Sequence, residues 1–260
     1  MIRTLFIIAG AALVLSIATL SGAAAISGND LFRNGWAWRI TDGNDNVRIR
    51  RVRGDETPEP AVTRTLEWTG GDRLVSALSA DIAYVRGDTA SVSITGPRAL
   101  VDRVRLEDGR LTLADGDVPE TVTFGIQARG AGAWADHQGL SIVVTAPAVS
   151  SFDLAGSGDM DLRGLTGPVV DLVISGSGDI SAEGQVDRLE LTITGSGDAE
   201  LADLATKSAT VQIAGSGQAK LAPSEQADIA ISGSGDVDLT TRPGRINQSI
   251  TGSGRVDIDG

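Results

Sequence analysis

Apolar and polar residues alternate along the C-terminal half of the chain, and a recurring Gly-Ser-Gly phrase interrupts the alternation. The apolar position two residues before each phrase holds Leu154, Ile174, Ile193, Ile213, Ile231 and Ile250. The position four residues before it holds Phe152, Leu172, Leu191, Val211, Ile229 and, as an exception, Gln248. A period of two indicates a strand with one buried face, whereas a helix would need a period of about 3.6.

The alternation resumes after each phrase. The first apolar position holds Met160, Ile180, Ala199, Ala219, Val237 and Val256, and the second holds Leu162, Ala182, Leu201, Leu221, Leu239 and Ile258. The residues between these positions are mostly Asp, Glu, Thr, Ser or Gln. Each unit is therefore predicted to consist of a strand, a Gly-Ser-Gly bend, a second strand and a return loop.

The six units are spaced almost evenly. Their first glycines stand at 156, 176, 195, 215, 233 and 252, which gives steps of 20, 19, 20, 18 and 19 residues. Repetition at a period of about twenty residues is typical of a solenoid, in which each unit buries its apolar face against its neighbours. The sequence predicts an all-β protein in which residues 151–260 form a parallel β-solenoid of about six coils.

Glycine suits the bend for two physical reasons. It accepts a positive φ without steric cost, and its missing Cβ lets stacked turns approach closely. We expect this structural role for the glycine pairs Gly156 and Gly158, Gly176 and Gly178, Gly195 and Gly197, Gly215 and Gly217, Gly233 and Gly235, and Gly252 and Gly254.

An aspartate follows four of the six bends, at Asp159, Asp179, Asp198 and Asp236. In a structural interpretation, each carboxylate accepts hydrogen bonds from N–H groups of the turn. In the alternative, the column binds Ca²⁺, which takes several oxygen ligands. Gln218 and the cationic Arg255 interrupt the column, and the Gly-Gly-x-Gly-x-Asp nonapeptide of calcium solenoids is missing. We therefore expect no metal and no other cofactor.

Residues 1–25 have the composition of a targeting segment. Arg3 carries its only charge, residues 5–20 are almost wholly apolar, and Ala23-Ala24-Ala25 resembles a cleavage site. The sequence predicts export with cleavage after Ala25. The uncharged run over residues 4–26 is also long enough to anchor the protein in a membrane if it is not cleaved.

The next stretch, residues 26–62, is predicted to be an arm and linker. Trp36 and Trp38 precede a cluster of arginines, and the stretch from Asp30 to Arg53 contains six arginines and three aspartates. Two interpretations are open: a contact arm for an anionic envelope surface, or an irregular strand whose tryptophans cap the solenoid. Residues 55–60, with two prolines, indicate a turn or linker.

Residues 63–150 are predicted to form a second β region that caps the solenoid. Short alternating runs are separated by turn signals, among them Asp108-Gly109, a hairpin signal. Four aromatic residues predict an aromatic core here: Trp68, Tyr84, Phe124 and Trp134. The glycine-rich stretch 125–139 is expected to be a loop, in which the single histidine, His137, is solvated.

Composition and charge exclude several functions. The chain has no cysteine, which rules out disulfides, thiolate nucleophiles and Cys-ligated zinc. Its net charge is −12, and residues 151–260 alone contribute −10, from 17 Asp and Glu against 7 Lys and Arg. This acidity argues against nucleic-acid binding.

The order of these features resembles the putative auto-transporter adhesin, head GIN domain family. The resemblance covers roughly residues 70–258 and is carried by the run over residues 78–95, Leu100-Val101-Asp102-Arg103-Val104, the Asp-Gly hairpin, Val143-Val144-Thr145-Ala146-Pro147 and the serial Gly-Ser-Gly-Asp repeats. It implies a bacterial envelope protein, periplasmic or on the outer surface, with a right-handed β-helix. It supplies no catalytic residues.

We therefore expect a non-catalytic binding or scaffolding module, adhesin-like, whose partner is an envelope component or a polysaccharide. One alternative is a carbohydrate-active enzyme with carboxylates on adjacent coils, although the short coils leave little length for cleft walls. The other alternative is a Ca²⁺-dependent module. A last expectation concerns residues 246–260, where Val256 and Ile258 keep an apolar face and an open strand edge predicts self-association or the docking of a partner.

Overall fold

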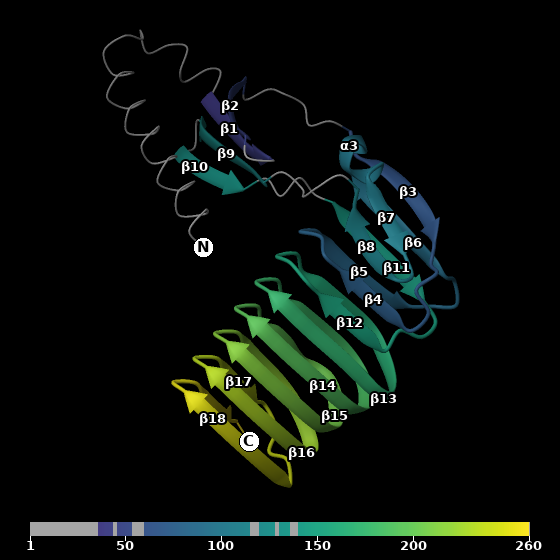
Figure 1. The fold of residues 1–260 in the computed structure, drawn as a ribbon, viewed down its shortest axis with the longest axis vertical. Helices are drawn as coiled ribbons and strands as arrows, with labels where there is room; N and C mark the ends of the chain where they lie inside the picture. Colours follow the sequence, from purple (N-terminus) through teal and green to yellow (C-terminus); the bar gives the residue numbers. More distant parts are fainter. Residues whose placement is uncertain are drawn as a thin grey trace. The chain divides into compact units, whose positions relative to one another are not determined.

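The Gly-Ser-Gly repeats build one continuous stack of parallel coils in the computed structural model of the protein (Figure 1). The structure describes residues 36–43, 46–53, 60–114, 120–127, 130–135 and 140–259, with backbone alone at 36–53 and 120–135. The predicted targeting segment, most of the predicted turn at 55–60, and His137 lie outside the described residues. The predicted β-solenoid is confirmed.

Four long strands make the body of the stack: β13 (Met160–Gly176), β14 (Ile180–Gly195), β15 (Ala199–Gly215) and β16 (Gln218–Gly233). Their register places Ile193 directly between Ile174 and Ile213. All three side chains are almost fully buried, as the period-two pattern predicted. Ladders of aliphatic residues therefore fill the interior.

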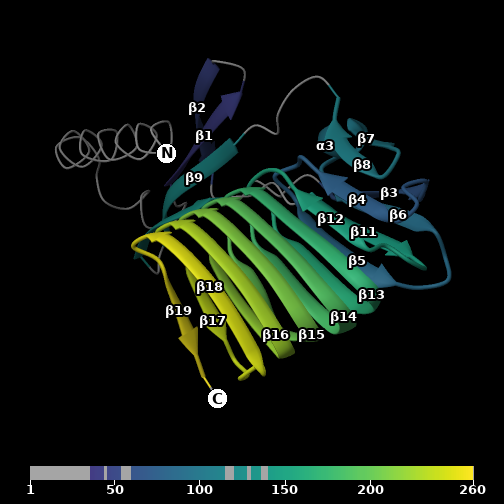
Figure 2. The ribbon, with the colours of Figure 1, turned by 60° about the horizontal axis from the view of Figure 1, so that its bottom comes forward.

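Each long strand contributes to two faces of the stack (Figure 2). The post-bend face is formed by the residues that follow each Gly-Ser-Gly phrase, and the pre-bend face by those that precede the next one. The two faces meet at a second corner, where the sequence predicted a return loop. That prediction is wrong for these four coils, because the parallel pairing continues around the second corner with local register shifts, for example between Leu162 and Leu165. Such irregularities bend a strand without ending its pairing.

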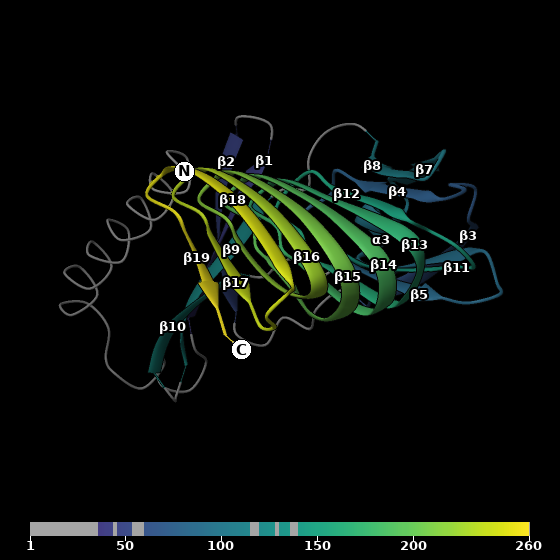
Figure 3. The same ribbon diagram turned by 90° about the horizontal axis from the view of Figure 1, so that it is seen from below.

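The stack changes at its C-terminal end, where the two faces are made by separate strands. β17 (Asp236–Leu239) and β19 (Arg255–Ile258) continue the post-bend face, and β18 (Arg245–Gly252) continues the pre-bend face. Figure 3 shows β18 on one side of this end and β17 with β19 on the other.

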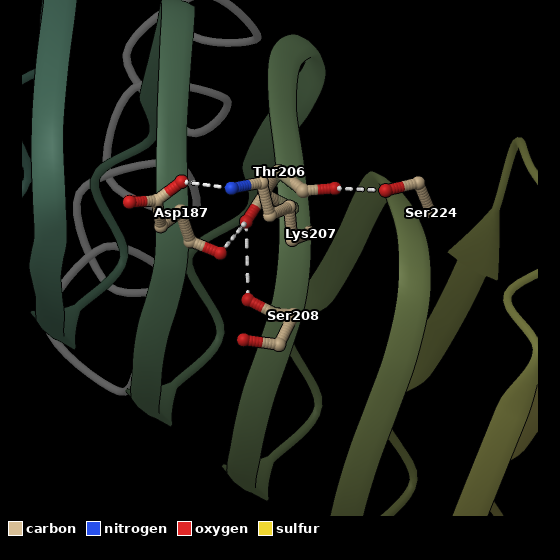
Figure 4. A network of polar contacts seen from close by, with 5 residues as sticks. All are labelled: Asp187, Thr206, Lys207, Ser208 and Ser224. Atoms are coloured by element: carbon tan, nitrogen blue, oxygen red, sulfur yellow. Dashed lines mark hydrogen bonds and ion pairs between the residues drawn. The ribbon is translucent and has the colours of Figure 1, made fainter.

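Hydroxyl groups hold successive coils together at the second corner (Figure 4). The buried Thr206 hydroxyl lies 3.4 Å from the Asp187 carbonyl oxygen of the preceding coil and 3.0 Å from that of Ser208. In the next coil Ser224 donates to the Thr206 carbonyl oxygen at 3.1 Å, and Thr241 then donates to that of Pro223 at 2.7 Å. These bonds satisfy backbone carbonyls where the register shifts, and an unpaired buried carbonyl would be costly.

The stack extends beyond the six repeats into the N-terminal β region. β12 (Ser151–Leu154) pairs in parallel with β4 (Arg73–Ser76), and the start of β13 pairs in parallel with β5 (Asp81–Arg86). This register aligns Leu78-Ser79-Ala80-Asp81 with Gly156-Ser157-Gly158-Asp159. A further coil, built from β4 and β5 and called the N-terminal coil below, therefore lies directly against the first repeat.

The stack and the strands that pair with it belong to one compact unit, and the remaining strands of that unit close the N-terminal end of the stack. β5 also pairs with β11 (Ser141–Ala146), which continues antiparallel through β6 (Ser91–Gly96) to β3 (Val62–Glu67), while β4 pairs with β8 (Arg110–Leu113) and β8 with β7 (Val104–Glu107). A short helix, α3 (Arg98–Val101), follows β6. The predicted Asp108-Gly109 hairpin is confirmed, with positive φ at both residues.

Two of the predicted aromatic core residues are buried here, Trp68 and Tyr84. The Tyr84 ring meets that of Phe152 edge to face, with centroids 5.1 Å apart. Its hydroxyl donates to the Ala146 carbonyl oxygen and accepts from the Val149 N–H, so its polar end is satisfied inside the core. Burial raises the pKa of Tyr84.

A second compact unit contains a four-stranded antiparallel sheet in the order β10-β9-β1-β2. Its strands are β1 (Trp36–Gly43), β2 (Asn46–Arg53), β9 (Glu120–Gln127) and β10 (Gly130–Ala135). The loop expected over residues 125–139 is therefore wrong at 125–127 and 130–135. Pairing with β1 and within the β9–β10 hairpin outweighs the low strand propensity of glycine.

The structure offers no helix with the length and hydropathy needed to span a membrane among the residues it describes.

Candidate functional site

The aspartates that follow the bends connect each coil to the next one. Oδ1 of Asp179 accepts the backbone N–H of Asp198 at 2.9 Å, and Oδ1 of Asp198 accepts that of Gln218 at 2.8 Å. Asp159 and Asp236 make the equivalent bonds to Asp179 and Arg255, at 3.4 and 3.1 Å. Each carboxylate therefore replaces a backbone carbonyl as the acceptor at the corner, where strand pairing lapses.

This arrangement bears directly on the Ca²⁺ interpretation of the column. One oxygen of each aspartate is already engaged with a backbone donor, and the side chains follow one another along the stack instead of converging. Among the described residues, no three carboxylate or imidazole side chains are grouped closely enough to hold a metal ion. The geometry favours the structural interpretation of the column.

We expect millimolar Ca²⁺ or a chelator to leave the melting temperature of the protein unchanged. An ion that bound only the folded state would raise that temperature in a saturable way. Thermal melts followed by circular dichroism, with Mg²⁺ at the same concentration as the control, make the measurement. A saturable increase of several degrees with Ca²⁺ alone would contradict this expectation.

The same column borders a hollow on the post-bend face. This first hollow has a volume of about 410 Å³, and its lining includes six carboxylates: Asp81, Asp159, Asp161, Asp179, Asp198 and Glu200. Arg163 forms an ion pair with Asp161. The hollow is therefore strongly acidic, and it joins residues from the N-terminal coil with residues from three repeats.

A second hollow continues along the same face towards the C-terminal end. It has a volume of about 600 Å³ and shares Asp198 and Glu200 with the first. Here two cations offset the acidic residues: Lys220 lies 3.5 Å from Glu200, and Arg255 lies 3.4 Å from Asp236. The two hollows together form what we call the trough.

The buried Oδ1 of Asp238, in the lining of the second hollow, has no hydrogen-bond partner among the described residues. This oxygen is closed to a ligand, but the exposed carboxylates of the trough, such as Asp198 and Glu200, accept hydrogen bonds from hydroxyl, amide or ammonium donors. The trough thus offers rows of acceptors along several coils. Its chemistry suits an elongated ligand that is rich in hydrogen-bond donors.

The pre-bend face carries a different set of polar side chains. Asp171 accepts a hydrogen bond from Ser151 at 3.4 Å, and desolvation together with the neighbouring Glu190 and Asp153 raises the pKa of Asp171. At the other end, Asn247 and Gln226 donate to Asp228 and lower its pKa. The Ser151–Asp171 and Asn247–Asp228 contacts run from coil to coil and consolidate the stack, whereas Gln226 lies on the same strand as Asp228.

Sequence reasoning identified the four aspartates of the column but missed the N-terminal part of the trough. Asp81 occupies the position of the repeat aspartates, because Ile82 pairs with Met160. A signal for it exists in the sequence: Leu78-Ser79-Ala80-Asp81 keeps the Ser and Asp of the repeated phrase and replaces both glycines. The side chains of the arginine-rich stretch, Arg48 to Arg53, lie outside the described part of the chain.

Several solved structures are similar to this chain, and one of them, a putative adhesin from Bacteroides fragilis, supports the fold. The crystal structure of a putative adhesin from Bacteroides fragilis has a TM-score of 0.53 at 18% sequence identity, covering 76% of this chain and 96% of that one. A putative lipid binding protein from Parabacteroides distasonis has a TM-score of 0.46 at 19% identity, with 77% and 97% covered. A putative adhesin from Parabacteroides merdae has a TM-score of 0.42 at 15% identity, with 77% and 97% covered.

Among curated proteins, none matches this chain. A family model does match, over residues 72–243, which is more than half of the chain. The matched segment begins at the N-terminal coil and ends after β17, so it contains most of the stack and most of the trough. The chain belongs to the putative auto-transporter adhesin, head GIN domain family.

Proposed function

We propose that this protein is an exported, non-catalytic binding module of the cell envelope, which holds an elongated ligand along the trough. The observation that carries the proposal is the construction of the trough from equivalent positions of successive coils, from Asp81 to Asp257. Parallel strands lie about 4.8 Å apart, so similar side chains recur at short, regular intervals. A polymer can contact several coils at once.

The charges of the trough indicate the class of polymer. Its carboxylates disfavour an anionic chain and favour hydroxyl or ammonium donors. A neutral or cationic polysaccharide fits this chemistry and supplies many hydroxyl groups. The repeated contacts would add up along the ligand, as in any multivalent complex.

The arrangement of the carboxylates supports binding over catalysis. Glycoside hydrolysis uses two carboxyl groups that flank the scissile bond. In the trough the aspartates of the column follow one another along a single face, and Asp159, Asp179 and Asp198 each use one oxygen to hold the next coil. A row of this kind can orient a chain without enclosing one of its bonds.

Export is part of the proposal and rests on the predicted targeting segment at residues 1–25. Mass spectrometry of the N-terminus in the periplasmic and membrane fractions tests it. A mature N-terminus at Ile26 supports cleavage, an intact segment in the membrane fraction supports an anchor, and recovery in the cytoplasm would contradict export.

A glycan array tests the ligand class, with Glu200→Lys as the trough variant and Glu190→Lys as the control. Both glutamates are exposed, and the two substitutions change the charge equally, but Glu190 belongs to the pre-bend strand segment. We expect binding to neutral or cationic glycans that Glu200→Lys weakens about tenfold, the effect of losing one charged hydrogen bond. Equal binding by both variants, or no glycan retained at all, would overturn the proposal.

A further inference from the structure

We propose that the terminal edge, formed by β18 and β19, is an interface through which two copies of this chain join about a two-fold axis. Among the described strands, β18 pairs only with β16 and β19 only with β17, so each has one free side (Figures 2 and 3). The free side of a strand presents unpaired N–H and C=O groups that another strand can satisfy.

The apolar interior of the stack is open at this edge. Ile250 is 39% exposed and Ile258 41%, whereas the residues that precede them in the same columns, Ile231 and Leu239, are 2% and 0% exposed. Isoleucines at core positions gain from covering, because burial of apolar surface is favourable. Neither strand contains a proline or a lysine, the residues that commonly block edge pairing.

The charges of β19 identify a second copy as the occupant. Side chains of Arg255 and Asp257 are 70% and 67% exposed, and Val256 stands between them. In an antiparallel pair of β19 strands centred on Val256, Arg255 of each copy lies opposite Asp257 of the other. Two opposite-charge pairs then form across the axis, and such pairs stabilise antiparallel strands.

Arg255 already contacts Asp236 and Asp257 of its own chain, at 3.4 and 3.5 Å. A guanidinium group has five N–H donors in a planar fork, so it can bind a further carboxylate at the same time. The contacts within the chain therefore do not exclude Asp257 of the second copy.

β18 can also pair with its own copy, through apolar and hydroxyl side chains instead of charged ones. With the pair centred on Ile250, the two Ile250 side chains lie opposite each other, and Ser249 lies opposite Thr251 of the second copy. Ile250 and Val256 stand three residues before and three residues after Ser253, the centre of the last bend. One axis can therefore pass close to both, and a single symmetric contact extends both faces of the stack. This self-complementarity is what an isologous interface requires.

Charge exchange provides the test, carried out on the full chain by sedimentation velocity over a range of concentrations. We expect a monomer–dimer equilibrium in the unaltered protein. Asp257→Lys and Arg255→Glu should each weaken it about tenfold or more, because like charges then face each other. An equimolar mixture of the two variants should dimerise again, and the double variant R255E/D257K should regain the dimer by itself.

Glu190→Lys, which makes the same charge change as Asp257→Lys in the middle of the stack, serves as the control and should leave dimerisation unchanged. Melting temperatures show whether each variant remains folded. A chain that stays monomeric at all concentrations would overturn the proposal. So would a dimer that neither charge reversal weakens, or one that the mixture and the double variant fail to restore.

Discussion

Replacing Ile193 with aspartate is expected to unfold the repeat stack. Ile193 is fully buried near the C-terminal end of β14, between Ile174 and Ile213 of the neighbouring coils. An isolated carboxylate in such a site costs several kcal/mol or more, and the whole stability of a domain is about 5–15 kcal/mol. Because each coil is held mainly by its neighbours, the damage at one layer separates the two halves of the stack.

The matched control is Thr194→Asp, which introduces the same carboxylate at the next residue of the strand. Thr194 is exposed on the pre-bend face, so its aspartate remains solvated. Far-UV circular dichroism and urea titration compare the two variants. If Ile193→Asp still unfolded cooperatively, at the same urea midpoint as the unaltered protein, the result would contradict the buried position of this column.

The interior of the stack could be predicted because its pattern is local. Every repeat carries its apolar residues at the same distance from Gly-Ser-Gly, so aligning the phrases aligns the columns. Parallel in-register pairing then follows, since each coil repeats the preceding one. Gln248 broke the column in the sequence, and it is exposed in the last coil.

The N-terminal coil escaped prediction because its neighbour in space is distant in sequence. β4 and β5 precede β12 and β13 by about seventy residues or more, and the intervening chain includes strands of another unit. Leu78 and Ala80 replace the two glycines, which removes the most visible part of the phrase. Asp81 in the trough could therefore not be assigned from the repeat alone.

The second corner was also beyond the sequence pattern. Its stabilising hydroxyls come from Thr206, Ser224 and Thr241, which do not occupy the same position of every repeat and bond to carbonyls of other coils. The roles of the column aspartates could likewise be predicted only in part. Their residue type indicated an acceptor, but only the stacking shows that the donor is a backbone N–H of the following coil.

Replacing Gly195 with alanine is expected to lower the stability of the stack by about 2–5 kcal/mol, through backbone strain and overpacking together. Gly195 has a φ of +130°, which a residue with a Cβ rarely adopts. A Cβ at this position would lie 2.3 Å from the carbonyl oxygen of Gly176. That oxygen accepts the Ser196 N–H at 2.9 Å, so moving it away weakens the bond between the two coils.

Gly156→Ala is the matched control, because the same phrase there meets a different neighbour. Gly156 has no positive φ, and its nearest contact for a Cβ is the Leu78 carbonyl oxygen at 3.3 Å. A small shift accommodates this contact, and alanine restricts the unfolded chain, so we expect a change within about 1 kcal/mol. The urea midpoints of the two variants should therefore differ clearly. Equal midpoints would mean that the stacking of one bend on another does not require glycine. The close approach of Gly195 to Gly176 would then not set the spacing of the coils.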